Sequence, residues 1–139
     1  AWYAGADYWQ HANETVLTMA MIETQKAVDQ LDEILSVPGL DAIYVGPSDL
    51  ALSIVCKPGF PPEDKVVDVI KVISAAAKKH GIYAGIHCGS TDMANEMIGY
   101  GYQFITMLAD NAFLAAAAKK AVAELRGIDS VSTKASGPY

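Results

Sequence analysis

The stretch AIYVGPSD at residues 42–49 decides the fold, because it joins a short apolar strand to a tight turn that ends in an acid. The apolar run is uninterrupted, which is typical of a parallel strand buried on both faces. The segment MAMIE at residues 19–23 has the same arrangement, with an apolar run that leads directly into Glu23. We therefore expect Glu23 and Asp49 to follow the carboxyl ends of two strands.

Alternating strands and helices extend outward from this stretch. Four short apolar segments, closed by turn residues, are predicted to be strands: 16–22, 42–45, 82–86 and 104–108. Helical spacing of apolar residues, or a high alanine content, predicts helices at 25–35, 63–80, 91–100 and 112–123. This order predicts an α/β protein with a parallel sheet, either four units of a (β/α)₈ barrel or a small doubly wound sheet.

The length bounds the domain organisation. The chain has 139 residues, whereas a complete (β/α)₈ barrel typically has ~250. We expect residues 1–127 to form part of a barrel domain and residues 128–139, which are polar and without periodicity, to form a flexible tail. The sequence starts at Ala1 without Met and is apolar from its first residues, so we expect a fragment or a processed piece.

Composition excludes several classes of function. The net charge is −6 and no run of Lys and Arg alternates with aromatic residues, which argues against nucleic-acid binding. No stretch approaches the ~20 apolar residues of a membrane span, and the first residues do not show a basic segment followed by an apolar one. We expect an intracellular, cytoplasmic protein in which Cys56 and Cys88 are free thiols.

The two acids predict a metal site. Carboxyl ends of neighbouring parallel strands meet at the edge where ligands bind, so Glu23 and Asp49 are expected to converge there. Two close carboxylates suit Mg²⁺, which keeps part of its water shell and takes other oxygens from the substrate. Each acid alone fits a simpler interpretation: Glu23 would stabilise the start of a helix, and Ser48 with Asp49 would cap a helical turn. The combination of the two acids favours the metal site.

The segments MIET at residues 21–24 and VPGLDAIYVGPSDL at residues 37–50 resemble the HpcH/HpaI aldolase family, and the likeness runs from about Asp7 to the alanine-rich helix. The resemblance implies the C-terminal half of a (β/α)₈ barrel, about four βα units. It implies that Glu23 and Asp49 bind Mg²⁺, Mn²⁺ or Co²⁺. It also implies that the backbone of the turn formed by Gly46, Pro47 and Ser48 binds the pyruvate carboxylate.

One polar residue departs from the family pattern. His87 ends the third predicted strand, where related aldolases carry an aliphatic side chain, so we consider it a candidate substrate-binding residue. A hydrogen bond to a nearby loop carbonyl is the equally weighted alternative. Cys88 is expected to be a packed thiol. His11 and His80 are expected to be solvated or structural, and residues 53–62 are expected to form a long loop of the kind that often covers a site.

The predicted activity is that of a class II, metal-dependent lyase that cleaves a 2-keto acid to pyruvate and an aldehyde through a pyruvate enolate. A macrophomate synthase-like decarboxylation of oxaloacetate with capture of the enolate is one alternative, and a non-catalytic, flavodoxin-like binding module is another. By resemblance, the general-base histidine and the substrate-binding arginine lie upstream, so no catalytic residue is assigned here and the isolated chain is expected to be inactive. The resemblance also implies a homo-oligomer, commonly a hexamer.

Overall fold

The computed structural model describes residues 5–59 and 62–127, so the predicted tail at residues 128–139 lies outside the described residues. Four parallel strands form one sheet in the order β1-β2-β3-β4. Their bounds are β1 Met19–Ile22, β2 Ala42–Val45, β3 Tyr83–Cys88 and β4 Phe104–Met107. The expected α/β architecture with a parallel sheet is confirmed.

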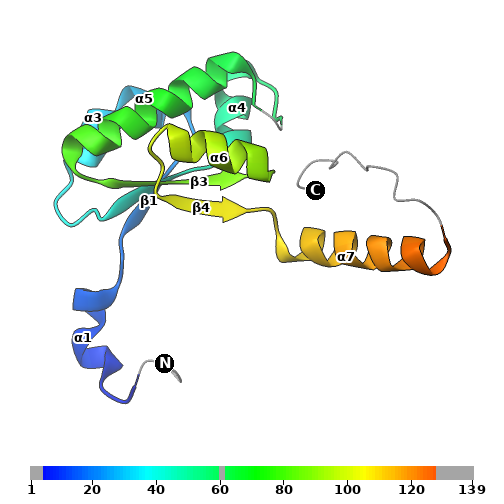
Figure 1. The fold of residues 1–139 in the computed structure, drawn as a ribbon. Helices are drawn as coiled ribbons and strands as arrows, with labels where there is room; N and C mark the ends of the chain where they lie inside the picture. The colour runs from blue at the N-terminus through cyan, green and yellow to red at the C-terminus, as the bar shows by residue number, and fades with distance from the viewer. Residues whose placement is uncertain (1–4, 60–61, 128–139) are drawn as a thin grey trace.

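Helices cover one face of this sheet. The bounds are α1 Tyr8–Thr15, α2 Gln25–Asp29, α3 Leu31–Leu35, α4 Pro47–Val55, α5 Asp64–His80, α6 Thr91–Gly99 and α7 Asp110–Leu125. Figure 1 shows α3, α4, α5 and α6 on the same side of the sheet, whereas α1 and α7 project away from it, and neither of these two helices buries a residue. None of the helices in the described part of the chain is long and apolar enough to cross a membrane.

The first strand is shorter than the sequence predicts. Residues 16–18 precede β1, and the backbone N–H of Thr18 donates to the Asp41 carboxylate at 2.7 Å. The paired part of β1 starts at Met19, which lies opposite Ala42, the first residue of β2. The prediction of a strand from residue 16 was therefore wrong, although the carbonyl of Thr18 still accepts hydrogen bonds from the backbone N–H groups of Asp41 and Ala42, at 3.0 Å and 3.2 Å.

The helices also differ from the predictions at three places. The amphipathic segment 25–35 is two helices separated at Gln30, and only the second of them buries residues, Leu31 and Leu35. The predicted loop at residues 53–62 begins later, because α4 continues to Val55 and ends at Cys56 with a left-handed backbone. Helix α1 was not predicted, since its sequence shows no apolar periodicity.

The two faces of the sheet carry different side chains. Paired residues in a parallel sheet share a face, and the row Ile22, Val45, Ile86 and Ile105 faces the helices. The neighbouring row, Met21, Tyr44, Gly85 and Phe104, faces the other side, where Met21 is 54% and Phe104 is 48% exposed. We call the first the covered face and the second the open face. In the described residues the strands are therefore buried on the covered face and partly exposed on the open face.

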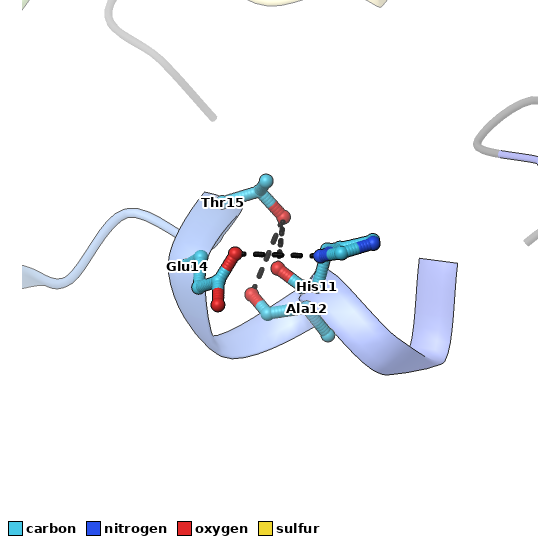
Figure 2. A network of polar contacts seen from close by, with 4 residues as sticks. All are labelled: His11, Ala12, Glu14 and Thr15. Carbon is cyan, nitrogen blue, oxygen red and sulfur yellow. Dashed lines mark hydrogen bonds and ion pairs between the residues drawn. The ribbon is translucent and has the colours of Figure 1, made fainter. Parts of the chain in front are cut away.

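His11 and His80 have structural surroundings, as predicted. His80 Nε2 lies 2.6 Å from Asp32 Oδ1 and links the end of α5 to α3. The pKa of Asp32 lies below its ordinary value, first because of the hydrogen bond with His80 and second because of the charge of Lys79. Figure 2 shows His11 beside Glu14 within α1, at 3.4 Å, which is a local contact on an exposed helix.

Candidate active site

Glu23 directly follows β1 and is half-buried. The next residue, Thr24, caps α2, because its Oγ1 accepts a hydrogen bond from the backbone N–H of Ala27 at 3.1 Å. The start of α2 therefore already has a capping side chain. Glu23 is not the capping residue, but its charge lies next to the positive end of α2, as the simpler interpretation of its position expects.

Asp49 lies in the first turn of α4 and is exposed. The residue that caps α4 is Gly46, which has no side chain to donate or accept, and Pro47 occupies the first helical turn. The interpretation in which Ser48 caps a short helical turn was therefore wrong. The negative charge of Asp49 at the positive end of the helix remains favourable.

The side chain of Glu23 lies over Gly46, next to Asp49. A Cβ atom added to Gly46 would lie 2.3 Å from Glu23 Oε1, so the missing side chain of this glycine makes room for the carboxylate. The backbone of Gly46 is extended, with φ of −97°, so space and not backbone conformation requires glycine here. The pKa of Glu23 lies above its ordinary value, first because of burial and second because of the nearby charge of Asp49. The Glu23 carboxylate thus lies close enough to Asp49 for the charge of Asp49 to raise its pKa, at the strand edge that the sequence predicts.

This arrangement suits a hard divalent cation. Within residues 5–59 and 62–127, no group of three or more His, Cys, Asp or Glu side chains gathers as a larger metal site. Two carboxylates would supply two oxygen ligands, and water and substrate oxygens would have to supply the others, which is the pattern that Mg²⁺ accepts. A cation between the acids would also remove the charge repulsion that raises the pKa of Glu23.

A single hydrogen bond ties the segments that carry the two acids. The backbone N–H of Gln25, two residues after Glu23, donates to Ser53 Oγ at 2.9 Å. Ser53 lies on α4, one helical turn after Asp49, so this bond holds the start of α2 against α4. The sequence analysis did not identify Ser53, because a backbone-to-hydroxyl contact between distant segments leaves no pattern in the chain.

The turn between β2 and α4 presents donors to an anion. The first backbone N–H groups of a helix have no partner within the helix, and no side chain caps α4. Pro47 is buried and carries no N–H group, so Ser48 and Asp49 provide the first donors. Together with the positive end of the helix dipole, this turn can bind a carboxylate beside the acid pair.

His87 lies on the open face and takes part in a polar cluster that the sequence analysis missed. Its Nδ1 atom lies 3.0 Å from Thr106 Oγ1, and the same oxygen lies 2.5 Å from the Tyr44 hydroxyl. Thr106 pairs with His87 across β3 and β4. One contact of His87 is therefore with a threonine hydroxyl on the neighbouring strand. Only the strand register could have revealed the cluster.

Comparisons with known proteins identify the relatives of this chain. The model of the family described as HpcH/HpaI aldolase/citrate lyase matches residues 5–118. A hydroxypyruvate/pyruvate aldolase from Rhizorhabdus wittichii is 40% identical over 125 residues, which is 89% of this chain and 50% of that protein. The chain thus spans about half the length of the curated relatives it matches.

Solved structures show the same relationship. An HpcH/HpaI aldolase/citrate lyase family protein from Burkholderia cenocepacia superposes with a TM-score of 0.79 at 35% identity, over 87% of this chain and 47% of that one. Macrophomate synthase superposes with a TM-score of 0.71 at 23% identity, over 88% of this chain and 43% of that one, a likeness of fold alone. The four βα units are therefore part of a (β/α)₈ barrel, and the chain belongs to the HpcH/HpaI aldolase/citrate lyase family.

Proposed function

We propose that this chain provides the metal-binding part of a lyase that acts on a 2-keto acid and cleaves it to pyruvate and an aldehyde through a pyruvate enolate. The observation that carries the proposal is the carboxylate of Glu23 over Gly46, with Asp49 beside it at the start of α4. The match to a relative named hydroxypyruvate/pyruvate aldolase supports the same class of substrate.

In this proposal each part of the site has one task. Glu23 and Asp49 hold a divalent cation, Mg²⁺, Mn²⁺ or Co²⁺. When bound, this cation supplies the positive charge that stabilises negative charge on the keto oxygen of the substrate. The turn formed by Gly46, Pro47 and Ser48 orients the substrate carboxylate with its backbone N–H groups. Ser53 keeps α4 and the start of α2 together, which fixes the distance between the two acids.

The remaining catalytic groups lie outside the residues assigned here. The family resemblance assigns the general base to a histidine and the second carboxylate contact to an arginine, both in the other half of the barrel. We therefore propose that activity requires that half, and that the assembled protein is a homo-oligomer, with a hexamer as the family-based expectation. The net charge is −6 and the sequence has no run of Lys and Arg, so the chain offers little positive charge of its own to an acid. We therefore expect a small acid that binds through the cation.

Decarboxylation of oxaloacetate is the second candidate function. His87 is the residue that suggests it, because an imidazole can contact a second carboxylate, but the contact of His87 with the uncharged hydroxyl of Thr106 makes this the weaker of the two candidates. Membership in an aldolase and lyase family disfavours the third possibility, a non-catalytic flavodoxin-like module. Parallel assays of the intact protein with an aldol substrate and with oxaloacetate separate the first two candidates by their relative kcat/KM.

The acid pair is tested most directly by metal binding. Binding of Mn²⁺ to the intact protein is measured by calorimetry for the wild type, Glu23→Gln, Asp49→Asn and the double variant. Each substitution keeps the shape of the side chain and removes its charge, so we expect at least a roughly tenfold weaker affinity in each single variant. Glu33→Gln, at an exposed position on α3, is the matched control and should bind Mn²⁺ as the wild type does. Unchanged affinity in the double variant would show that these acids do not hold the metal.

A further inference from the structure

The open face carries one polar cluster that connects three strands. The Tyr44 hydroxyl on β2 and His87 Nδ1 on β3 both contact Thr106 Oγ1 on β4, at 2.5 Å and 3.0 Å. All three side chains are half-buried. Their neighbours in the preceding row of this face, Met21, Gly85 and Phe104, are apolar or have no side chain. The cluster is therefore a local polar feature of an otherwise apolar surface.

This cluster lies next to the acid pair. Val45 pairs with Ile86, so the residues that follow them, Gly46 and His87, are level on neighbouring strands. Neighbouring strands are about 4.8 Å apart, and the carboxylate of Glu23 occupies the space above Gly46. The imidazole therefore belongs to the strand next to the one whose end, at Gly46, lies beneath the Glu23 carboxylate.

The position of Tyr44 is fixed by close packing. Its ring lies 6.1 Å from the ring of Phe104, with a tilt of 56° between the planes. Both rings lie above Gly85, where an added Cβ atom would come within 2.9 Å of each of them. This arrangement requires glycine between the two aromatic residues and limits the places that the phenol oxygen can occupy. The hydroxyl contact with Thr106 is thus held by the packing beneath it.

The order of donors in the cluster follows from the acidity of its groups. Because a phenol is a better donor than an aliphatic hydroxyl, we assign the Tyr44 O–H as the donor to Thr106 Oγ1 and the Thr106 O–H as the donor to His87 Nδ1. This order selects the neutral imidazole with its proton on Nε2. A substrate hydroxyl that reaches this edge of the ring can exchange with a contact already made there.

The charges around the cluster decide between a hydroxyl and a second carboxylate as its ligand. Tyr44 and Thr106 are uncharged groups, so neither supplies a positive charge to a second carboxylate. In the described ranges, none of the Lys and Arg residues lies on a strand. An uncharged hydroxyl group therefore suits this surface better than a second carboxylate does.

We propose that Tyr44, Thr106 and His87 form a selectivity element that favours a 2-keto acid carrying a hydroxyl group over one that lacks it. His87 contacts the substrate hydroxyl, and Thr106 is a positioning residue that acts through the imidazole. The proposal rests on the proposed function, since it places the 2-keto acid at the Glu23 and Asp49 site, and it predicts that oxaloacetate is the poorer ligand.

The experiment compares ligands and variants in the intact protein. Dissociation constants of pyruvate, hydroxypyruvate and oxaloacetate are measured with Mn²⁺ present, and the tautomer of His87 is read from long-range ¹H–¹⁵N correlations. The variants are Thr106→Val, which keeps the shape and removes the hydroxyl, Thr106→Ser, which restores the hydroxyl, and Tyr44→Phe, which keeps the ring.

We expect the wild type to carry the Nε2–H tautomer and to bind hydroxypyruvate more tightly than pyruvate, with oxaloacetate weakest. Thr106→Val should reduce the preference for hydroxypyruvate roughly tenfold and leave Mn²⁺ affinity unchanged. Thr106→Ser should recover the preference for hydroxypyruvate. Tyr44→Phe should shift the tautomer of His87. A preference that is the same in the wild type and in Thr106→Val, with Mn²⁺ and pyruvate still bound, overturns the selectivity element alone. A wild-type protein that binds neither Mn²⁺ nor a 2-keto acid overturns the proposed function, and this inference with it.

Discussion

The covered and open faces of the same sheet have opposite characters. On the covered face, Ile22, Val45 and Ile86 are fully buried beneath the helices, and the row is aliphatic throughout. On the open face, the next row combines exposed apolar side chains with the aromatic pair, and the row beyond it carries Glu23, His87 and Thr106. Residues one position apart along a strand therefore belong to different parts of the molecule.

This difference teaches that stability and chemistry are separated by the alternation of the strands. Burial of aliphatic area on the covered face contributes most of the folding free energy that the sheet provides. The open face contributes little burial in this chain, and its polar groups lie at the carboxyl edge where the acid pair meets α4. A substitution should therefore affect either folding or ligand binding, according to the face on which it lies.

The largest expected effect is on stability. Ile86→Ala removes a fully buried side chain from the middle of the covered face, and we expect a loss of about 2–5 kcal/mol in the free energy of unfolding. Met21→Ala, at a 54% exposed position on the open face, is the matched variant and should cost less than about 1 kcal/mol. Urea denaturation followed by circular dichroism measures both. Equal losses in the two variants would show that the open face is as well packed as the covered one.

Much of the fold could be predicted, because short apolar runs and glycine exits are local signals. The predicted strand at 42–45 coincides with β2, and the predicted helix at 63–80 starts within one residue of α5 and ends at Gly81 in a left-handed conformation. The break at Gln30 has no proline or glycine to announce it. The start of β1 depends on where β2 begins, and this pairing is not a property of residues 16–18.

The site divides in the same way. Glu23 and Asp49 could be predicted because their positions after apolar strands are visible in the sequence, and the structure brings them together. Their role as metal ligands stays a prediction. The contact of His87 with Thr106 and Tyr44 could not be predicted, because it depends on the register of three strands whose residues are far apart in the chain.

Thiol reactivity gives a second, smaller contrast that sharpens the comparison. Cys88 is buried on the covered face, and burial raises the pKa of its thiol from 9.0 to about 11, whereas Cys56 is exposed. At pH 8 the thiolate fraction of Cys88 should be roughly a hundredfold lower than that of an unperturbed thiol. Mass spectrometry after brief iodoacetamide treatment should find Cys56 modified and Cys88 intact. The rate of Cys88 modification should increase as the pH rises toward 11. In urea, Cys88 should be modified as fast as Cys56. Rapid labelling of native Cys88 at pH 8 would contradict its burial.

The smallest expected effect comes from a substitution that disturbs the acid pair without disturbing folding. Gly46→Ala adds a Cβ atom 2.3 Å from Glu23 Oε1, so the carboxylate must move. It lies at the end of a flexible side chain, and the extended backbone at φ of −97° accepts alanine, so the free energy of unfolding should change by less than about 1 kcal/mol. Mn²⁺ affinity should nevertheless fall roughly tenfold, because the displaced acid no longer faces Asp49. Gly99→Ala in α6, where an added Cβ meets no atom within 4 Å, should leave Mn²⁺ affinity unchanged and raise stability slightly. If Gly46→Ala binds Mn²⁺ as tightly as the wild type, the position of the Glu23 carboxylate over Gly46 is not the one that holds the metal.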